Sequence, residues 1–320
     1  MYSFKITVIL SIVLSSLLHA TPNNKKIAYI VSDTSIPYWR ILAQGIKNKA
    51  KKNGYSLTIY NAQNSKKNEL IHTITAIKED VEGIILSPIN SSTATTILKL
   101  TQQANIPVII ADVGSDTSQY ISYISSNNYQ GAYALGKILA KKMRSLQWDT
   151  NATVGIIAIP QKRSNGKKRT KGFLKAMHEA KIKGADMRQQ VNFSVQETYN
   201  FAKELIKRNP KLKALWLQGS DKYQGALDAI KDSGKGGEIL LICFDAEPIF
   251  LELIPKGILI GSAMQQPYLM GQKALEVMHK HLNGEEVEKH IELKILAISA
   301  DNIEQMLERI KKNVLGMESE

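Results

Sequence analysis

The chain has 320 residues, of which 43% are hydrophobic, and it carries a formal net charge of +13. This length and composition exclude wholesale disorder and predict about two domains, since a domain takes roughly 150 residues. The Lys and Arg residues are spread over helix-like segments, and no zinc-finger, basic-zipper or RNA-recognition signature is present. We therefore expect no nucleic-acid partner.

The first twenty residues have the three-part layout of a secretory signal peptide. Lys5 precedes an uncharged apolar run over residues 6–18, and the small Ala20 precedes a polar stretch. The run is shorter than the ~20 residues that span a bilayer, which favours cleavage near Ala20 over an uncleaved anchor. Cleavage would remove only Lys5 among the charged residues, so the net charge falls from +13 to +12. We expect the mature chain in the periplasm.

Apolar strand-like runs then alternate with helical segments. We predict strands over residues 26–32, 56–61, 83–87, 107–111, 153–159, 187–192, 213–218, 238–244 and 258–263. The strands are nearly continuous apolar runs, as in strands buried on both faces. The pattern predicts an α/β fold of parallel, doubly wound sheets.

The series changes near residues 121–127, where an alternating strand is followed by a helix that starts behind Asn127. We therefore expect one α/β unit over residues 25–125 and a second over 127–264. A long helix after residue 264 ends at Asn283-Gly284, a common C-terminal capping signal. A last strand over 290–298 and a helix over 301–313 complete the prediction.

Cys243 is the only cysteine of the chain, and it lies in the apolar run EILLICFDA. A small buried residue is the expected role there, and the mature chain has no internal disulfide. A lipid anchor is also not expected, because no cysteine lies near residue 20.

The residues that follow the strands are candidates for a site, because ligands of open parallel sheets bind beyond the carboxyl ends of the strands. These segments are 32–39, 61–64, 87–90, 112–113, 160–169, 192–193, 218–221, 244–245 and 264–265. They are rich in Asp, Asn, Gln, Ser and aromatic residues. They contain no metal-spaced histidines, Walker loop, dinucleotide-binding glycine motif or G-x-S-x-G elbow. We expect no catalytic residues, no metal and no cofactor.

Amides, carboxylates and aromatic faces together suit a small neutral polyhydroxylated ligand. A carboxylate accepts hydroxyl hydrogens in bonds worth about 1.5–3 kcal/mol each. An aromatic ring covers the C–H face of a sugar and adds about 1 kcal/mol beyond the area that it buries.

The sequence resembles the ribose- and galactose-type periplasmic binding proteins, which have the type I solute-binding fold. The resemblance covers residues 25 to 298 and includes IAYIVSDTSIPYW, VEGIILSPINSS, ISSNNYQGAYALGKILAKK, NPKLKALWLQGSDKYQGALDAI and ICFDA. The order and spacing of these segments carry it. It implies two doubly wound lobes joined by three hinge crossings, near residues 125–127, 264–266 and 293–295. The N-terminal lobe is then 25–126 plus 266–294, and the C-terminal lobe is 127–265 plus 295–320.

The resemblance also implies which side chains contact the ligand. By position these are Ser32, Tyr38, Trp39, Asp112, Arg169, Phe193, Asp245 and Gln265. Tyr38 and Trp39 would clamp the sugar ring, although either could instead be a core residue at the helix start. Arg169 could instead be one more solvated cation in the run KRSNGKKRTK, and Asp245 could also cap a helix.

Three positions depart from the ribose-binding pattern, and each loses a polar contact. Ile36 stands in place of an asparagine, Val113 in place of an arginine, and Gly219 in place of an asparagine. Three contacts at about 1 kcal/mol each correspond to a roughly hundredfold loss of affinity if nothing replaces them. We therefore expect a ligand with fewer hydroxyls or with an apolar edge against Ile36 and Val113.

The family resemblance implies capture of a small sugar- or polyol-like ligand by hinge closure, followed by recognition of a monomeric closed form by a membrane partner. We expect that partner to be an ABC importer. The alternative is a sensor kinase or chemoreceptor, for which the extension over residues 299–320 is an argument; the extension could equally be a helix packed on the C-terminal lobe. A lactose-repressor-type regulator would need an N-terminal DNA-binding domain, and the first predicted strand begins too early in the chain to leave room for one. An enzyme is not expected either, because the sequence contains no set of nucleophile and base residues.

Overall fold

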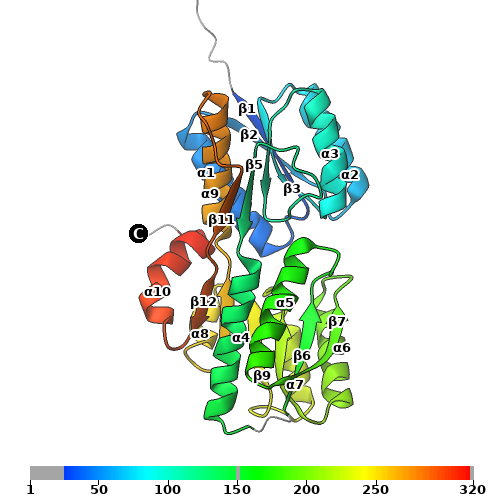
Figure 1. Ribbon diagram of the computed structural model, residues 1–320, viewed down its shortest axis with the longest axis vertical. Helices are drawn as coiled ribbons and strands as arrows, with labels where there is room; N and C mark the ends of the chain where they lie inside the picture. The colour runs from blue at the N-terminus through cyan, green and yellow to red at the C-terminus, as the bar shows by residue number, and fades with distance from the viewer. Residues whose placement is uncertain (1–24, 149–151, 318–320) are drawn as a thin grey trace, which may run out of the picture.

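A computed structural model describes residues 25–148 and 152–317 of the chain. The predicted signal peptide and its cleavage site near Ala20 lie outside the described residues. Two lobes are stacked along the long axis of the molecule, and each is built on a six-stranded sheet with helices on both faces (Figure 1). The predicted fold class is confirmed. No helix among the described residues has both the length and the apolar character needed to cross a membrane.

The first lobe contains a fully parallel sheet with the strand order β11-β5-β4-β3-β1-β2. Its strands are β1 (Lys26–Val31), β2 (Ser56–Asn61), β3 (Gly83–Ser87), β4 (Val108–Ala111), β5 (Ser122–Ser126) and β11 (His290–Leu293). Its helices are α1 (Pro37–Lys52), α2 (Lys66–Lys78), α3 (Ser91–Gln103) and α9 (Pro267–Leu282).

The strand β1 shows why these runs are apolar throughout. Ile27, Tyr29 and Val31 pack into a cluster with α1 and α9. Ala28 and Ile30 point to the other face and pack into a cluster with α2 and α3. Because successive side chains of a strand alternate between faces, covering both faces leaves no solvent-exposed position in the strand after Lys26.

The second lobe has the strand order β12-β10-β9-β8-β6-β7. Its strands are β6 (Thr153–Ala158), β7 (Lys183–Gln189), β8 (Leu212–Leu217), β9 (Leu240–Phe244), β10 (Gly261–Met264) and β12 (Leu296–Ser299), and only β12 is antiparallel to its neighbour. Its helices are α4 (Asn128–Ser145), α5 (Ser164–Glu179), α6 (Val195–Arg208), α7 (Tyr223–Asp232), α8 (Phe250–Leu253) and α10 (Ile303–Arg309), followed by a π-helical turn η1 (Ile310–Val314). Cys243 is fully buried in β9, as expected.

The chain passes between the two sheets three times, from β5 to α4, from β10 to α9 and from β11 to β12. On this basis we propose that residues 25–126 with 266–294, and 127–265 with 295–320, move as the two rigid lobes. Residues 149–151 and 318–320 of the second set lie outside the described part of the chain.

Three predicted elements differ clearly from those of the structure, and the strand predicted over 258–263 also begins three residues later, over 261–264. The strand predicted over 290–298 is two strands in different sheets, because the run crosses the hinge at residues 294–295. The strand predicted over 187–192 lies over 183–189, at the edge of its sheet, where a partly exposed strand needs no apolar run. The helix predicted over 301–313 is shorter and ends in a π-helical turn.

Candidate ligand-binding site

A pocket of about 60 Å³ lies between the lobes, where the loops after seven strands meet. The first lobe contributes residues after β1 and β4. The second lobe contributes residues after β6, β7, β8, β9 and β10. The site is therefore at the carboxyl ends of the strands of both sheets, as in other open parallel sheets.

Seven of the eight predicted ligand residues line this pocket. They are Tyr38, Trp39, Asp112, Arg169, Phe193, Asp245 and Gln265. Ser32 is not part of the lining: it is fully buried, its hydroxyl has no hydrogen-bond partner among the described residues, and its carbonyl accepts the backbone N–H of Asn64. A direct contact of Ser32 with the ligand is thus not supported by its position, while the ligand-binding roles of the other seven stay predictions.

Asp112 and Asp245 occupy equivalent places, directly after β4 and β9. Both have left-handed backbones, with φ of 69° and 66°. Each N–H is held by the neighbouring strand, since Asp112 donates to the carbonyl of Ile124 and Asp245 to that of Ala263, both at 2.9 Å. The left-handed turn costs about 1 kcal/mol for such a residue and aims each carboxylate into the cleft.

Burial dominates the electrostatics of the two carboxylates. Desolvation raises the pKa of Asp112 to about 6, against the opposing effect of the Arg169 cation. Desolvation also raises the pKa of Asp245, and Arg169 and the amide of Gln265 oppose that rise. Burial therefore makes both groups more costly to ionise than an exposed aspartate, and the hydrogen bonds donated to them offset part of that cost.

Arg169 links three segments of the second lobe through hydrogen bonds. Its Nε donates to Asn128 Oδ1 at 2.7 Å, and its Nη1 donates to the carbonyl of Gln218 at 2.6 Å and to Asp245 Oδ2 at 3.4 Å. The guanidinium also stacks on the ring of Phe244, 3.8 Å from its centroid. Only 3% of the side chain is exposed, so Arg169 is a buried scaffold as well as a pocket residue and not a solvated cation.

The aromatic residues enter from both lobes. The rings of Tyr38 and Trp39 meet edge to face at 5.0 Å, and the Tyr38 hydroxyl donates to Asp112 Oδ1 at 3.1 Å. Trp39 combines the two roles considered for it, because it packs in the core of the first lobe and also lines the pocket. Phe193 faces them from the second lobe and has a left-handed backbone with φ of 51°.

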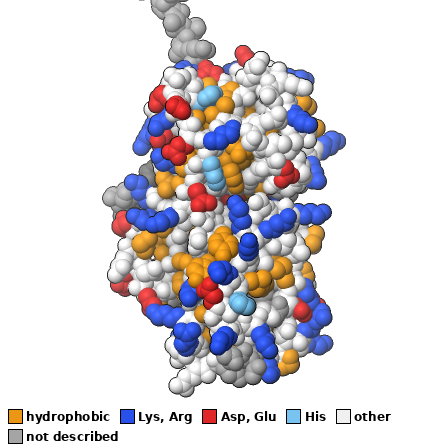
Figure 2. All heavy atoms as spheres, viewed as in Figure 1, with side chains coloured by type: hydrophobic (Ala, Val, Ile, Leu, Met, Phe, Trp, Pro, Cys, Tyr) orange, Lys and Arg blue, Asp and Glu red, His pale blue; other side chains and the backbone are white. Residues whose placement is uncertain are grey.

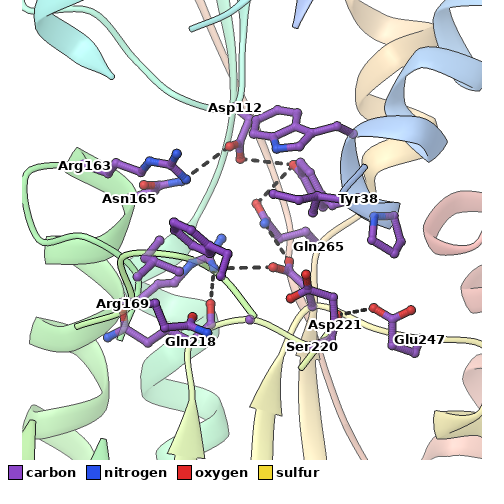
Figure 3. A pocket seen from close by; sticks show the side chains of 18 residues that line it. Tyr38, Asp112, Arg163, Asn165, Arg169, Gln218, Ser220, Asp221, Glu247 and Gln265 are labelled. Atoms are coloured by element: carbon purple, nitrogen blue, oxygen red, sulfur yellow. Dashed lines mark hydrogen bonds and ion pairs between the residues drawn. The ribbon is translucent and has the colours of Figure 1, made fainter. Parts of the chain in front are cut away.

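Hydrogen bonds cross between the lobes, so the cleft is closed (Figure 3). Asn165 Nδ2 donates to Asp112 Oδ2 at 3.4 Å, and the Tyr38 hydroxyl shares its one hydrogen between Asp112 and Gln265 Oε1, which lies 3.5 Å away. Gln265 in turn donates to Asp245 Oδ1 at 2.7 Å, which links the carboxylates of the two lobes through one amide and one phenol.

The pocket contains eleven residues besides the predicted ligand contacts, and one of them is Ile36, which the sequence predicts against an apolar edge of the ligand. They are Ile36, Pro37, Ile159, Arg163, Asn165, Gln190, Gln218, Gly219, Ser220, Asp221 and Glu247. Most lie in the strand-end segments that the sequence does mark. Glu247 lies two residues past such a segment, where its carboxylate accepts the Ser220 hydroxyl at 2.7 Å. Val113, expected against an apolar edge of the ligand, is instead buried in the core of the first lobe.

Two doubly wound lobes, three crossings and a polar, aromatic cleft between the lobes define the type I class of solute-binding proteins. Residues 27–286 match the family described as periplasmic binding protein domain. The chain belongs to this family, and within it to the ribose- and galactose-binding type that the sequence resembles.

Individual relatives match over most of their length. The ribose import binding protein of Escherichia coli strain K12 is 27% identical over 285 residues, which are 88% of this chain and 93% of the relative. The D-apiose import binding protein of Actinobacillus succinogenes is 25% identical over 86% of this chain and 87% of its own. The solved structure of a carbohydrate transporter solute-binding protein from Agrobacterium radiobacter, in complex with D-arabinose, superposes with a TM-score of 0.82 at 21% identity, covering 92% of this chain and all of that one.

Proposed function

We propose that this protein is a periplasmic receptor that captures a small sugar-like ligand by closure of its two lobes and delivers it to an ABC importer, without changing the ligand chemically. The observation that carries the proposal is the cleft itself, in which Asp112 of one lobe faces Asp245 of the other between aromatic walls. Import is the role printed in the names of the ribose and apiose relatives.

The cleft suits a neutral, hydroxyl-rich ligand because its two carboxylates can accept more hydrogen bonds than the protein donates to them. Hydroxyl groups that donate to Asp112 and Asp245 would replace the water lost on closure, and the cations of Arg163 and Arg169 offer donors to ring or hydroxyl oxygens. Asn165 and Arg163 also bring polar groups to the Asp112 side of the pocket, where the chain has Val113 in place of an arginine. Asn165 and Arg163 thus offer polar groups in place of those that the departures from the ribose-binding pattern remove.

Closure itself supplies the signal for the partner. A ligand that touches both lobes stabilises the closed form by its differential affinity for the two states. The importer then needs only to recognise the closed arrangement of the two lobe surfaces.

The tail gives no support to the sensory alternative. Ile303, Ile310, Val314 and Leu315 are buried in the core of the second lobe, so residues 303–315 are a packed part of the fold rather than a free extension. This leaves the importer as the partner that the relatives favour.

A thermal-shift screen tests the proposal on the mature chain, residues 21–320. The panel would contain D-ribose, D-allose, D-apiose, D-arabinose, D-galactose and myo-inositol. A sugar present at a hundred times its Kd should stabilise the protein by about 2.7 kcal/mol. Asp245→Ala should abolish this shift, whereas Asp232→Ala, which changes an exposed carboxylate of the same lobe, should preserve it. A shift that survives Asp245→Ala contradicts the site, and turnover of the bound sugar contradicts the function.

A further inference from the structure

We infer that the cleft has an outer subsite for a second sugar unit, so that the cognate ligand is a disaccharide or another glycoside rather than a free monosaccharide. This inference rests on the proposed function, because it extends the same cleft. It is carried by a second hollow that adjoins the central pocket at the mouth of the cleft, which we call the outer chamber.

The outer chamber shares lining residues with the central pocket and is also formed by both lobes. Ile36, Arg163 and Phe193 line both spaces and so form a neck between them. Beyond the neck, the first lobe contributes Asp33, Asn64 and Ile89, and the second contributes Val191, Asn192 and Lys222. These residues follow β1, β2, β3, β7 and β8, so the chamber extends away from the hinge strands, toward the edge strands β2 and β7.

The lining has the chemistry of a sugar site. Asp33, Asn64 and Asn192 offer oxygen and nitrogen atoms to hydroxyls, while Ile89, Val191 and Phe193 offer apolar surface to C–H faces. Val191 is 75% exposed in the closed structure, so a ligand unit in the chamber would bury apolar surface that closure alone leaves in water.

The walls of the chamber are fixed before any ligand arrives. In the second lobe, one carboxylate holds the loop, because the consecutive N–H groups of Val191, Asn192 and Phe193 all donate to Glu197 at 2.9–3.1 Å. In the first lobe, Asn64 Nδ2 donates to Asp33 Oδ2 at 2.8 Å. Walls preorganised in this way reduce the ordering cost of binding.

Arg163 lines both the central pocket and the outer chamber, and its guanidinium has donors that are free among the described residues. Within residues 25–148 and 152–317, its guanidinium donates no hydrogen bond and forms no ion pair, and it lies over the Phe193 ring at 5.6 Å from the centroid. Five N–H donors at a half-buried neck require acceptors. A glycosidic oxygen and its neighbouring hydroxyls, passing from the pocket into the chamber, would supply them.

The test uses isothermal titration of the mature protein with matched sugars: D-galactose against lactose and melibiose, D-glucose against cellobiose and maltose, and D-ribose. We expect at least one two-unit sugar to bind about tenfold or more tightly than its monosaccharide. Val191→Trp, which fills the chamber, should weaken that sugar by about tenfold or more and leave monosaccharide affinity within about twofold. The control is Val195→Trp, because Val195 is 45% exposed, lies four residues further along and does not line the chamber.

The outcomes separate the inference from the proposed function. If monosaccharides bind and every two-unit sugar is rejected, or if Val191→Trp changes all affinities no more than Val195→Trp does, the outer subsite is wrong and the receptor function stands. If no sugar of either size binds, the sugar-receptor function fails and the outer subsite fails with it.

Discussion

At the scale of single residues, two arginines from one segment serve different purposes. Arg169 lies within α5, fully surrounded by Asn128, Gln218, Asp245 and Phe244. Arg163 precedes the same helix, and its guanidinium faces the ligand space and the ring of Phe193. Of the two arginines, only Arg169 donates hydrogen bonds to acceptors of the described protein.

This difference predicts opposite phenotypes. Arg169→Ala leaves the buried Asp245 without its cation and should lower the free energy of unfolding by about 3–5 kcal/mol. Arg163→Ala removes no hydrogen bond of the described structure and should change it by less than about 1 kcal/mol, while weakening ligand binding. Urea unfolding of the two variants measures the change in the free energy of unfolding. Titration with a sugar that binds the wild type measures the change in affinity. Equal stabilities of the two variants would show that Arg169 is not a structural residue.

A second prediction at this scale concerns pH and Asp112. Its pKa is raised to about 6, first by burial, while Arg169 and Arg163 lower it and Asp245 raises it; Tyr38 donates to its carboxylate. A raised pKa means that the folded, closed form binds a proton more tightly than the unfolded chain does. The contribution of Asp112 to stability therefore increases as pH falls from about 6 toward the ordinary value of 3.8.

Ligand binding should respond in the opposite direction. A protonated Asp112 accepts fewer ligand hydroxyls, so affinity should fall as pH drops below about 6, by at most tenfold per pH unit for one proton. Titrations between about pH 5 and about pH 7.5 measure this slope. Asp112→Asn should bind more weakly at neutral pH and show a flatter profile. A wild-type profile with no slope in this range would mean that Asp112 does not meet the ligand as a carboxylate.

At the scale of helices and strands, the pair α1 and α9 fixes the first lobe next to the hinge. The two helices approach so closely that a Cβ at Gly45 would collide with the carbonyl oxygen of Tyr268, and one at Gly271 with that of Leu42. Reciprocal glycines of this kind set the distance between the helices, since backbone cannot move aside as a flexible side chain does.

Gly45→Ala should therefore destabilise the protein. Alanine favours a helix by up to about 1 kcal/mol over glycine, but overpacking against backbone costs about 1–3 kcal/mol. We expect a net loss that lowers the melting temperature. Gly236→Ala is the control, because no heavy atom lies within 4 Å of the added Cβ. An unchanged melting temperature for Gly45→Ala would mean that the helix contact is loose.

The same elements show what a sequence can and cannot predict. Strands buried on both faces, such as β1, are continuous apolar runs and were found at nearly their observed limits. The edge strand β7 was misplaced because partial exposure leaves no such run. A sequence also gives the end of a strand but not the direction of each side chain after it. Val113 therefore proved to be a core residue, and Arg163 and Asn165 emerged as pocket residues only from the geometry.

At the scale of the whole molecule, the C-terminal tail adds a connection between the lobes beside the three crossings. Its apolar residues Val314 and Leu315 are buried in the second lobe. Its polar groups reach toward the first lobe, because the carbonyl of Gly316 accepts Gln44 Nε2 of α1 at 3.3 Å. Figure 1 shows α10 beside the second lobe near the level where the lobes meet.

Gln266 joins this connection to the hinge. Its Nε2 donates to the carbonyl of Lys294 at 2.7 Å, which ties the second crossing to the third. Its Oε1 accepts Asn313 Nδ2 of the tail at 3.0 Å. These hydrogen bonds are present in the closed form. Each one that breaks when the lobes open stabilises the closed form relative to the open form.

The last prediction is that the double variant Gln44→Ala/Asn313→Ala opens more readily. Two lost hydrogen bonds at about 0.5–1 kcal/mol each would shift the closed–open equilibrium by about 1–2 kcal/mol, or roughly 5- to 30-fold. Ligand-free X-ray scattering should show a larger radius of gyration, and affinity for a bound sugar should fall by up to the same factor. Gln224→Ala/Asp228→Ala, which removes a hydrogen-bonded pair on the surface of α7, is the control. If scattering and affinity match the wild type, the tail is a passive part of the second lobe and closure depends on the ligand and the three crossings alone.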